Sequence, residues 1–246
     1  MKTRLLSLML ATLAVPSLAA QARPSGTELY ERNVEATGGK ALIEKVAHRH
    51  VWGRFEVPAQ GMGGPIEMIT ARPMKMLTKI EIPGMGSTTS GLNGEVGWVL
   101  NPAMGPMLVE GLALDQMKQQ ADMEAILNPS RYVVSRETTG EANHGGAPCW
   151  VVTVTTKWKE TYSECYDKAT GLLSATTRKQ VTPMGEFEAT TVYSDYKTFD
   201  GLRMATTVRA STMGIEQVIH IDSVSTKPIP DSVFELPKEI KALKKN

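Results

Sequence analysis

The sequence predicts a mainly β protein (α+β) built on one curved antiparallel sheet, with an N-terminal helix and one internal helix against the concave side. Apolar and polar residues alternate with a period of two from His48 onward, and turn residues recur at short intervals between these runs. A helical pattern interrupts the strands once, over 112–127. A sheet of about a dozen strands curls or splits rather than staying flat.

The first 22 residues are typical of a cleavable secretory signal. Lys2 and Arg4 form a short basic region, and residues 5–15 form an apolar run that is too short to span a bilayer. Small residues at the end of this segment predict cleavage after Ala22, with Ala19 as the alternative. We therefore expect an exported, periplasmic protein.

Residues 23–246 are expected to form a single domain, because no linker-like segment divides them. No second apolar run reaches the roughly 20 residues of a transmembrane helix, so the mature chain is not expected to span a membrane. The chain has 27 Lys and Arg residues, two of them in the signal, against 26 Asp and Glu. This near balance gives no electrostatic footprint for nucleic acid or for an anionic membrane.

Two short helices are expected before the first strand. Ser25 and Glu28 fit a capping box, and the helix that they begin ends at the glycine pair 38–39. A second short helix follows over 40–47. In the strand that begins at His48, one face carries Val51, Gly53, Phe55 and Val57.

The remaining strands form an antiparallel meander on either side of the internal helix. Asn93-Gly94 is among the strongest hairpin signals, and Asn128-Pro129 ends the internal helix. At 1.5 Å per residue this helix is about 24 Å long, enough to return the chain across the sheet. The strand-like runs are 65–72, 74–82, 87–92, 95–100 and 107–110 before the helix, and 131–139, 148–157, 161–167, 172–182, 186–197, 202–212 and 215–226 after it.

Cys149 and Cys165 are the two cysteines, and their spacing predicts a disulfide. A hairpin with a three-residue loop at 156–158 places them directly opposite each other, where Cβ atoms lie about 4.5–5.5 Å apart. Export permits the bond. The alternative is two free buried thiols, and a metal pair is disfavoured because no His or Cys stands nearby at ligand spacing.

Catalytic motifs are missing from the sequence. It contains no nucleophile elbow, no His-Glu-x-x-His, no phosphate-binding loop and no dinucleotide fingerprint. His48 and His50 share a strand face without a third ligand, and a copper(I) site at Met74 and Met76 lacks a His or Cys. We therefore expect no catalytic residue, no metal and no cofactor.

Five methionines are each followed by glycine at predicted turns, which alternate along the meander. Turns of alternate hairpins lie at the same end of a sheet, so these residues are expected to form one flexible apolar rim suited to varied ligands. The alternative is that glycine serves the turn and methionine fills gaps. The five are Met62, Met85, Met104, Met184 and Met213.

The order of elements resembles the LolA/LolB-like superfamily, and more closely its exported outer-membrane lipoprotein-sorting proteins. The segments that carry the resemblance are Ala36-Thr37-Gly38-Gly39, Tyr193-Ser194-Asp195-Tyr196 to Asp200-Gly201-Leu202, and the closing Phe234-Glu235-Leu236-Pro237. The resemblance implies a half-closed β-barrel of about eleven strands, lidded by helices, that shelters acyl chains. No cysteine near the cleavage point offers a lipid attachment site, so a membrane-anchored acceptor of the LolB kind is disfavoured.

The leading hypothesis is a periplasmic carrier that shelters a lipid, or the acyl chains of a lipidated protein, for transfer toward the outer membrane. The alternative is an envelope protein-interaction or scaffold module of the same fold, in contact with a membrane complex and without lipid. A third hypothesis is an enzyme that uses carboxylates for catalysis. The expected lining of the concavity is Phe55, Val57, Met68, Met76, Ile80, Trp98 and Leu100 on strands, with Leu114 and Met117 from the internal helix.

Overall fold

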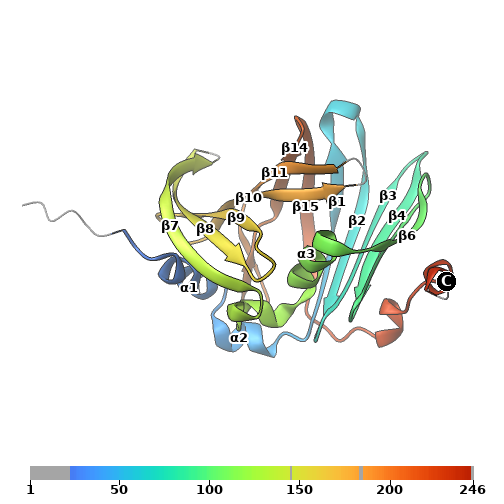
Figure 1. The fold of residues 1–246 in the computed structure, drawn as a ribbon, viewed down its shortest axis with the longest axis horizontal. Helices are drawn as coiled ribbons and strands as arrows, with labels where there is room; N and C mark the ends of the chain where they lie inside the picture. Colours follow the sequence, from blue (N-terminus) through green and yellow to red (C-terminus); the bar gives the residue numbers. More distant parts are fainter. Residues whose placement is uncertain (1–22, 145, 183–184, 245–246) are drawn as a thin grey trace, which may run out of the picture.

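A computed structural model describes residues 23–144, 146–182 and 185–244 (Figure 1). The predicted signal segment and Met184 lie outside these residues. Strands before the internal helix are β1 (His48–Val57), β2 (Met62–Ala71), β3 (Lys75–Ile82), β4 (Gly86–Asn93), β5 (Val96–Asn101) and β6 (Gly105–Val109). Strands after it are β7 (Val133–His144), β8 (Ala147–Thr156), β9 (Thr161–Asp167), β10 (Leu173–Thr182), β11 (Gly185–Ser194), β12 (Lys197–Phe199), β13 (Leu202–Met204), β14 (Thr207–Thr212) and β15 (Ile215–Ser225).

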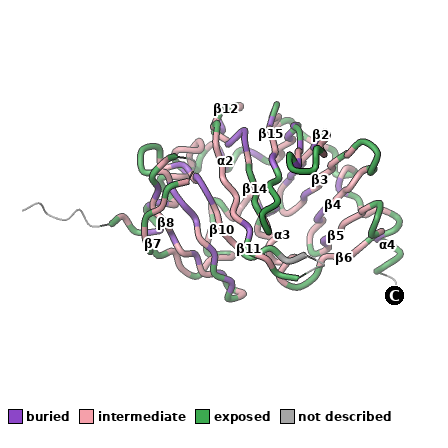
Figure 2. Tube along the Cα trace, turned by 90° about the horizontal axis from the view of Figure 1, so that it is seen from above, coloured by how far each residue is buried: buried purple, intermediate pink, exposed green. Residues whose placement is uncertain are grey.

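Thirteen of these strands form one antiparallel sheet in the order β6-β5-β4-β3-β2-β1-β15-β14-β11-β10-β9-β8-β7, and β12 pairs with β13 separately. The sheet is strongly curved and does not close into a barrel. This confirms the predicted curved antiparallel sheet. Buried residues lie mainly along the strands, as in β8 and β10, while the turns at the strand ends are exposed (Figure 2).

The chain crosses the concave side of the sheet between β6 and β7, because these two strands are its opposite edges. Helix α3 (Gly111–Ala121) makes the first part of this crossing and lies between the two arms of the sheet in Figure 1. The 3-10 turns η2 (Met123–Ile126) and η3 (Pro129–Arg131) make the rest.

The predicted helix over 112–127 was too long, because Asp122 ends it. Asp122 adopts an extended backbone (φ −78°, ψ 97°), and its side chain accepts a hydrogen bond from the backbone N–H of Glu124 at 2.9 Å. The carboxylate also accepts from the Tyr132 hydroxyl at 2.8 Å. Asp122 is buried, and its hydrogen bonds require the chain to turn here.

The predicted strands 186–197 and 202–212 are likewise interrupted near their junction. The Thr206 hydroxyl donates to the carbonyl of Asp195 at 2.5 Å, and the Thr206 N–H donates to the carbonyl of Ser194 at 3.1 Å. These contacts separate the short β12–β13 hairpin from β11 and β14.

Two helices precede β1, as expected. Helix α1 (Gly26–Ala36) begins with the predicted capping box between Ser25 and Glu28 and packs Leu29 against the concave side of β8 and β9. Helix α2 (Lys40–Lys45) follows directly. The 3-10 turn η1 (Pro58–Gln60) joins β1 to β2.

The C-terminal segment covers the convex face of the first strands. Phe234, in η4 (Asp231–Phe234), packs on Ile69 and Ala71, and its carbonyl accepts a hydrogen bond from Asn93 Nδ2 at 3.0 Å. Helix α4 (Lys238–Leu243) continues beside β6. Within the described residues, no helix combines the length and apolar character needed to cross a bilayer.

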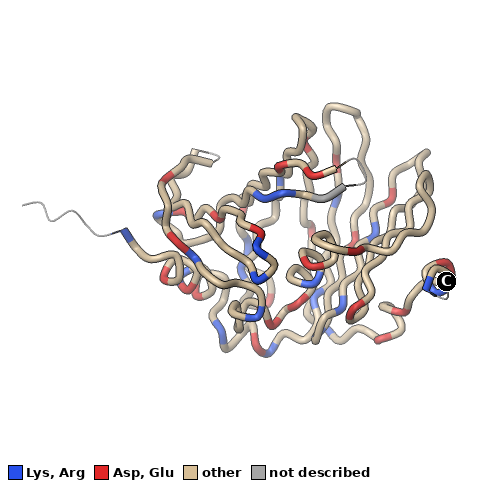
Figure 3. The backbone as a smooth tube through the Cα atoms, in the orientation of Figure 1, with Lys and Arg blue, Asp and Glu red and all other residues tan. Residues whose placement is uncertain are grey.

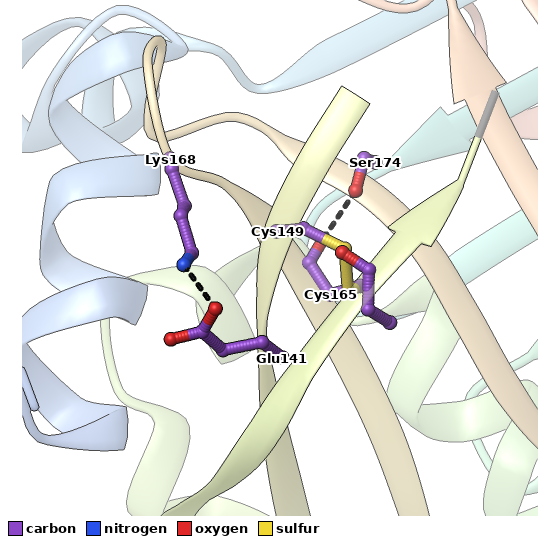
Figure 4. Close-up of a disulfide and its surroundings, with 6 residues drawn as sticks. Glu141, Cys149, Cys165, Lys168 and Ser174 are labelled. Carbon is purple, nitrogen blue, oxygen red and sulfur yellow. Dashed lines mark hydrogen bonds and ion pairs between the residues drawn. A yellow bond between two sulfur atoms is a disulfide. The ribbon is translucent and has the colours of Figure 1, made fainter. Parts of the chain in front are cut away.

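Cys149 and Cys165 form the predicted disulfide, with 5.5 Å between their Cα atoms (Figure 4). The predicted register was wrong by two residues: Cys149 pairs with Asp167, and Val151 pairs with Cys165. The loop from β8 to β9 has four residues instead of three. It is held by hydrogen bonds between Thr156 and Glu160, so the cysteines bond diagonally across the strands.

Removing this crosslink should lower stability by about 3 kcal/mol, the chain-entropy value for a loop near 15 residues; the two cysteines are 16 apart in sequence. Urea unfolding of C149A/C165A against the oxidised wild type measures the difference. A thiol reductant should destabilise the wild type to a similar degree and leave the double variant unchanged. Equal stability of all forms would contradict the expectation.

Candidate ligand-binding cavity

A cavity of about 470 Å³ lies between the concave face of the sheet and the segments that cross it. Its floor comes from seven strands, and the side chains that form it are Arg49, Val133, Arg136, Tyr162, Glu164, Leu173, Tyr193, Val208 and Ile221. One wall comes from the β12–β13 region, with Tyr196, Leu202, Arg203, Met204 and Ala205. Most of the surface that lines the cavity is apolar.

The roof, which we call the lid, consists of α1, α2 and residues 119–132. Val34 and Ile43 of the lid pack with Val46 and Leu202 in one buried cluster. The side chains and backbone of Tyr30, Asn33, Thr37, Gln119, Gln120, Asp122, Met123, Ala125, Ile126, Pro129 and Tyr132 complete the roof. The cavity is therefore enclosed by elements that meet only in the tertiary structure.

Polar contacts of two side chains, Tyr30 and Arg72, connect the segments of the lid to each other and to the sheet. The Tyr30 hydroxyl donates to the carbonyl of Ile126 at 2.8 Å, which joins α1 to η2. Arg72, at the end of β2, donates to the carbonyls of Val46 and Ile43 at 2.8 and 2.9 Å and forms an ion pair with Glu124. Arg72 thus fastens both α2 and η2 to the sheet.

Charged groups in the floor are paired with each other. The Arg136 guanidinium lies 3.4 Å from Glu164 and 3.9 Å from the ring centroid of Tyr30, and Glu164 accepts from the Tyr166 hydroxyl at 2.6 Å. Burial lowers the pKa of Arg136, but Glu164 and the nearby tyrosines raise it, and the net pKa lies above its usual value. The Arg136 guanidinium therefore stays charged at neutral pH.

Five of the six tyrosines of the chain line the cavity: Tyr30, Tyr132, Tyr162, Tyr193 and Tyr196. Burial raises the pKa of Tyr30 and of Tyr132 to about 12. Burial also raises the pKa of Tyr162, Tyr193 and Tyr196, and that of Tyr166 beside them. The tyrosines present neutral rings to the cavity.

Solved structures with similar folds exist for other bacterial proteins. A DUF1329 family protein from Desulfovibrio piger superposes with a TM-score of 0.59 at 14% identity, covering 85% of this chain and 97% of that one. A LolA superfamily protein from Nitrosomonas europaea gives 0.57 at 12% identity, covering 87% and 99%. A putative outer membrane lipoprotein-sorting protein domain from Vibrio parahaemolyticus gives 0.56 at 12% identity, covering 90% and 98%.

The chain has a LolA-like fold. At these identities the likeness concerns the fold alone. No family model matches the sequence, and no curated protein matches it. The predicted LolA-like architecture is confirmed, with an open sheet and helices over its concave side.

None of the predicted concavity residues lines the cavity of this LolA-like fold. Phe55 and Val57 do face the concave side, but they pack with Ile66 further along the sheet. Met62, Met68 and Ile80 pack against this cluster. Because the sheet curves tightly, neighbouring side chains on its inner face fill this end with a solid core.

Met76, Leu114 and Met117 also come together, and they also pack as core. Met76 forms a cluster with Leu92 and Ala121, against which Leu114 and Met117 pack. A Cβ atom at Gly97 would lie 2.9 Å from Leu114 Cδ1, so α3 rests directly on β5. The helix fills the concavity here, and the cavity begins at its last turn, where Gln119 and Gln120 line it.

Trp98 and Leu100 were assigned to the wrong face. Met76 pairs with Leu92, and Leu92 pairs with Gly97, so Gly97 faces the concave side and the neighbouring Trp98 faces away from it. The Trp98 indole is buried over Gly91 on the convex side.

The methionine turns lie at one end of the sheet, but it is the end remote from the cavity. Strands β1, β3, β5 and β14 run in the same direction and end there (Figure 1). Met85, Met104 and Met213 are 59%, 55% and 65% exposed, whereas Met62 packs inward at the start of β2. Arg49 and the cavity are near the other end of β1, so the methionines do not line it.

In the described residues, one group of three side chains brings possible metal ligands close together. His144 lies near Cys149 and Cys165, but the two sulfur atoms are bonded to each other. His50 stacks on Trp52 with 3.7 Å between ring centroids and meets Glu67 at 2.5 Å on the convex face. Lys and Arg are interspersed with Asp and Glu along the chain (Figure 3).

The tyrosines are the feature of the sequence that could have indicated where the cavity lies, and they were not predicted to line it. All six stand outside the β1–β6 half of the sheet, where the lining was expected. Tyr193, Tyr196 and Leu202 were recognised only as part of the family-like segment. Their position at a break between strands, beside the Asp200-Gly201 turn, is the feature that could have placed them at the end of the sheet.

In the folded protein the tyrosines should therefore ionise at a pH above their usual pKa of about 10. Because the pKa of every tyrosine is raised in the fold, the native state holds protons that the unfolded chain has released above pH 10. Stability should be unaffected by these groups below pH 10 and should fall as pH rises toward 12.

Ultraviolet difference absorbance of tyrosinate measures the pH at which the tyrosines ionise, and circular dichroism measures the pH at which the protein unfolds. We expect tyrosinate to form together with the loss of fold at alkaline pH, and near pH 10 in urea. Titration of several tyrosines near pH 10 with the fold intact would contradict the structure.

Proposed function

We propose that the protein binds an acyl chain of a lipid, or of a lipidated protein, in the cavity beneath the lid and carries it within the periplasm. The apolar, lidded cavity is the observation that carries this proposal. A volume of about 470 Å³ falls within the range of roughly 300–1,000 Å³ for small-molecule sites. The protein would act by sequestration and without catalysis.

Physical chemistry supports a carrier role. Each methylene group of an acyl chain costs about 0.8 kcal/mol when it is exposed to water, so a chain in transit needs an apolar enclosure. The signal-like N-terminal segment supports a periplasmic location, and the likeness to a lipoprotein-sorting domain supports lipidated cargo.

The lid supplies a route of entry. It is attached by apolar packing of Leu29, Val34 and Ile43, by the Tyr30–Ile126 hydrogen bond and by the contacts of Arg72, rather than by strand pairing. Because these contacts lie outside the strand ladder, the lid can open while the sheet stays intact.

A second candidate function is a protein-interaction module of the envelope. The exposed Met85, Met104 and Met213 at the remote end favour it, because thioethers adapt to varied apolar surfaces. Native mass spectrometry of the purified mature protein separates the two functions. The carrier should retain lipid extractable by organic solvent, whereas an empty protein that is indifferent to added lipid would favour the interaction module.

Filling the cavity should abolish acyl binding without unfolding the protein. Val208 lies in the middle of the floor on β14, and Val208→Trp would occupy the space of the ligand. We expect an acyl-chain fluorophore to bind at least tenfold more weakly, a loss of about 1.4 kcal/mol.

Ser211→Trp is the matched control, because Ser211 is exposed on the outer face of the same strand. It should bind the fluorophore like the wild type. Equal binding by Val208→Trp and the wild type would place the ligand elsewhere.

A further inference from the structure

Arg49 is a cation in the floor of the cavity. It is the second residue of β1 and pairs in the sheet with Thr70, on the face that also carries Val51 and Phe55. Its side chain lines the cavity, and burial lowers the pKa of its guanidinium. Arg49 therefore places a positive charge in apolar surroundings.

This charge has no partner in the described part of the chain. The Arg49 guanidinium forms neither a hydrogen bond nor an ion pair there. The two carboxylates that line the cavity are already engaged, Glu164 with Arg136 and Asp122 with Arg131 and Tyr132. Proteins seldom bury a charge without pairing it, because loss of hydration is costly.

Two further buried polar atoms lack a hydrogen-bond partner, one on the residue opposite Arg49 and one on a residue that lines the cavity. The hydroxyl oxygen of Thr70, opposite Arg49, is buried without a hydrogen bond. Gln119 lines the cavity from α3; its Nε2 lies 3.4 Å from the Tyr162 hydroxyl, while its Oε1 is buried without a partner. Buried polar groups are usually paired, so these three side chains leave unused hydrogen-bonding capacity, two of them in the lining of the cavity and the third opposite Arg49 in the sheet.

We propose that Arg49 binds the carboxylate of a single-chain anionic lipid, a fatty acid, whose hydrocarbon chain occupies the cavity. This inference rests on the proposed function and specifies the cargo. The guanidinium is a planar fork that matches a carboxylate with two parallel hydrogen bonds. The Thr70 hydroxyl, beside Arg49 in the sheet, adds a donor for the same head group.

Charge and volume support a carboxylate with one chain. Arg136 is neutralised by Glu164 and Arg203 is exposed, so among the arginines that line the cavity Arg49 alone offers a half-buried, unpaired charge, which matches a monoanion. At roughly 30 Å³ for a water-sized group, a volume of about 470 Å³ corresponds to one acyl chain rather than three. The neutral tyrosines of the lining do not repel the head group.

The test compares hexadecanoate with hexadecanol, which has the same chain without the charge, below their aggregation concentrations. The wild type should bind hexadecanoate more tightly. Arg49→Met should weaken hexadecanoate binding about 10- to 100-fold and leave hexadecanol binding unchanged. Arg54→Met is the matched control, because Arg54 is exposed on the outer face of β1; both ligands should bind it as they bind the wild type.

Thermal unfolding gives a second readout. Removing an unpaired, half-buried charge should raise the Tm of the ligand-free protein by about 2–4 °C, in contrast to the loss expected for a structural arginine. Arg49→Lys keeps the charge and loses the fork, so it should bind hexadecanoate less tightly than the wild type and more tightly than Arg49→Met.

Four results would contradict the proposal that Arg49 binds the carboxylate of a fatty acid. If the wild type binds both ligands equally, or if Arg49→Met loses both alike, the carrier function stands and the role of Arg49 fails. If a monoacyl phosphate binds more tightly than hexadecanoate, the head group is not a carboxylate. If neither ligand binds the wild type, the carrier function fails as well.

Discussion

The open sheet is the constraint on which the rest of the structure depends. Thirteen strands leave two unpaired edges, β6 and β7, and the chain has to pass from one to the other after β6. The shortest route runs through the concavity. The crossing segment therefore becomes both core and roof: α3 packs on β5 through Gly97, and the residues after it enclose the cavity.

Polar groups in this interior are stabilised by specific partners. Asp122 is satisfied by residues 124–132 of its own segment, whereas Glu164 and Arg72 bond to segments more distant in sequence; together they fix where the lid lies. In such surroundings an unpaired group is conspicuous. Arg49 stands out because the two carboxylates that line the cavity are already paired, and the same desolvation that keeps the tyrosines neutral makes its charge costly.

Local patterns predicted much of the fold. The alternation in β1, the Ser25–Glu28 capping box and the hairpin signal at Asn93-Gly94 correspond to the elements found. The cavity lining was not predicted, because several strands, among them β2 and β5, carry apolar residues on both faces. Trp98 is buried on the convex side, away from the helices of the lid. The residue of β5 that faces α3 is Gly97, which has no side chain to mark it in the sequence.

Most strands and turns, the two cysteines that bond and the crossing helix could be predicted from local sequence patterns, because they depend on residues close together in the chain. Only the tertiary structure decided which face of each strand is concave, where the cavity lies and which charge remains unpaired. Those properties depend on register between strands, as the two-residue shift at Cys149 and Cys165 illustrates, and on segments such as α1 and η2 that meet across the sheet.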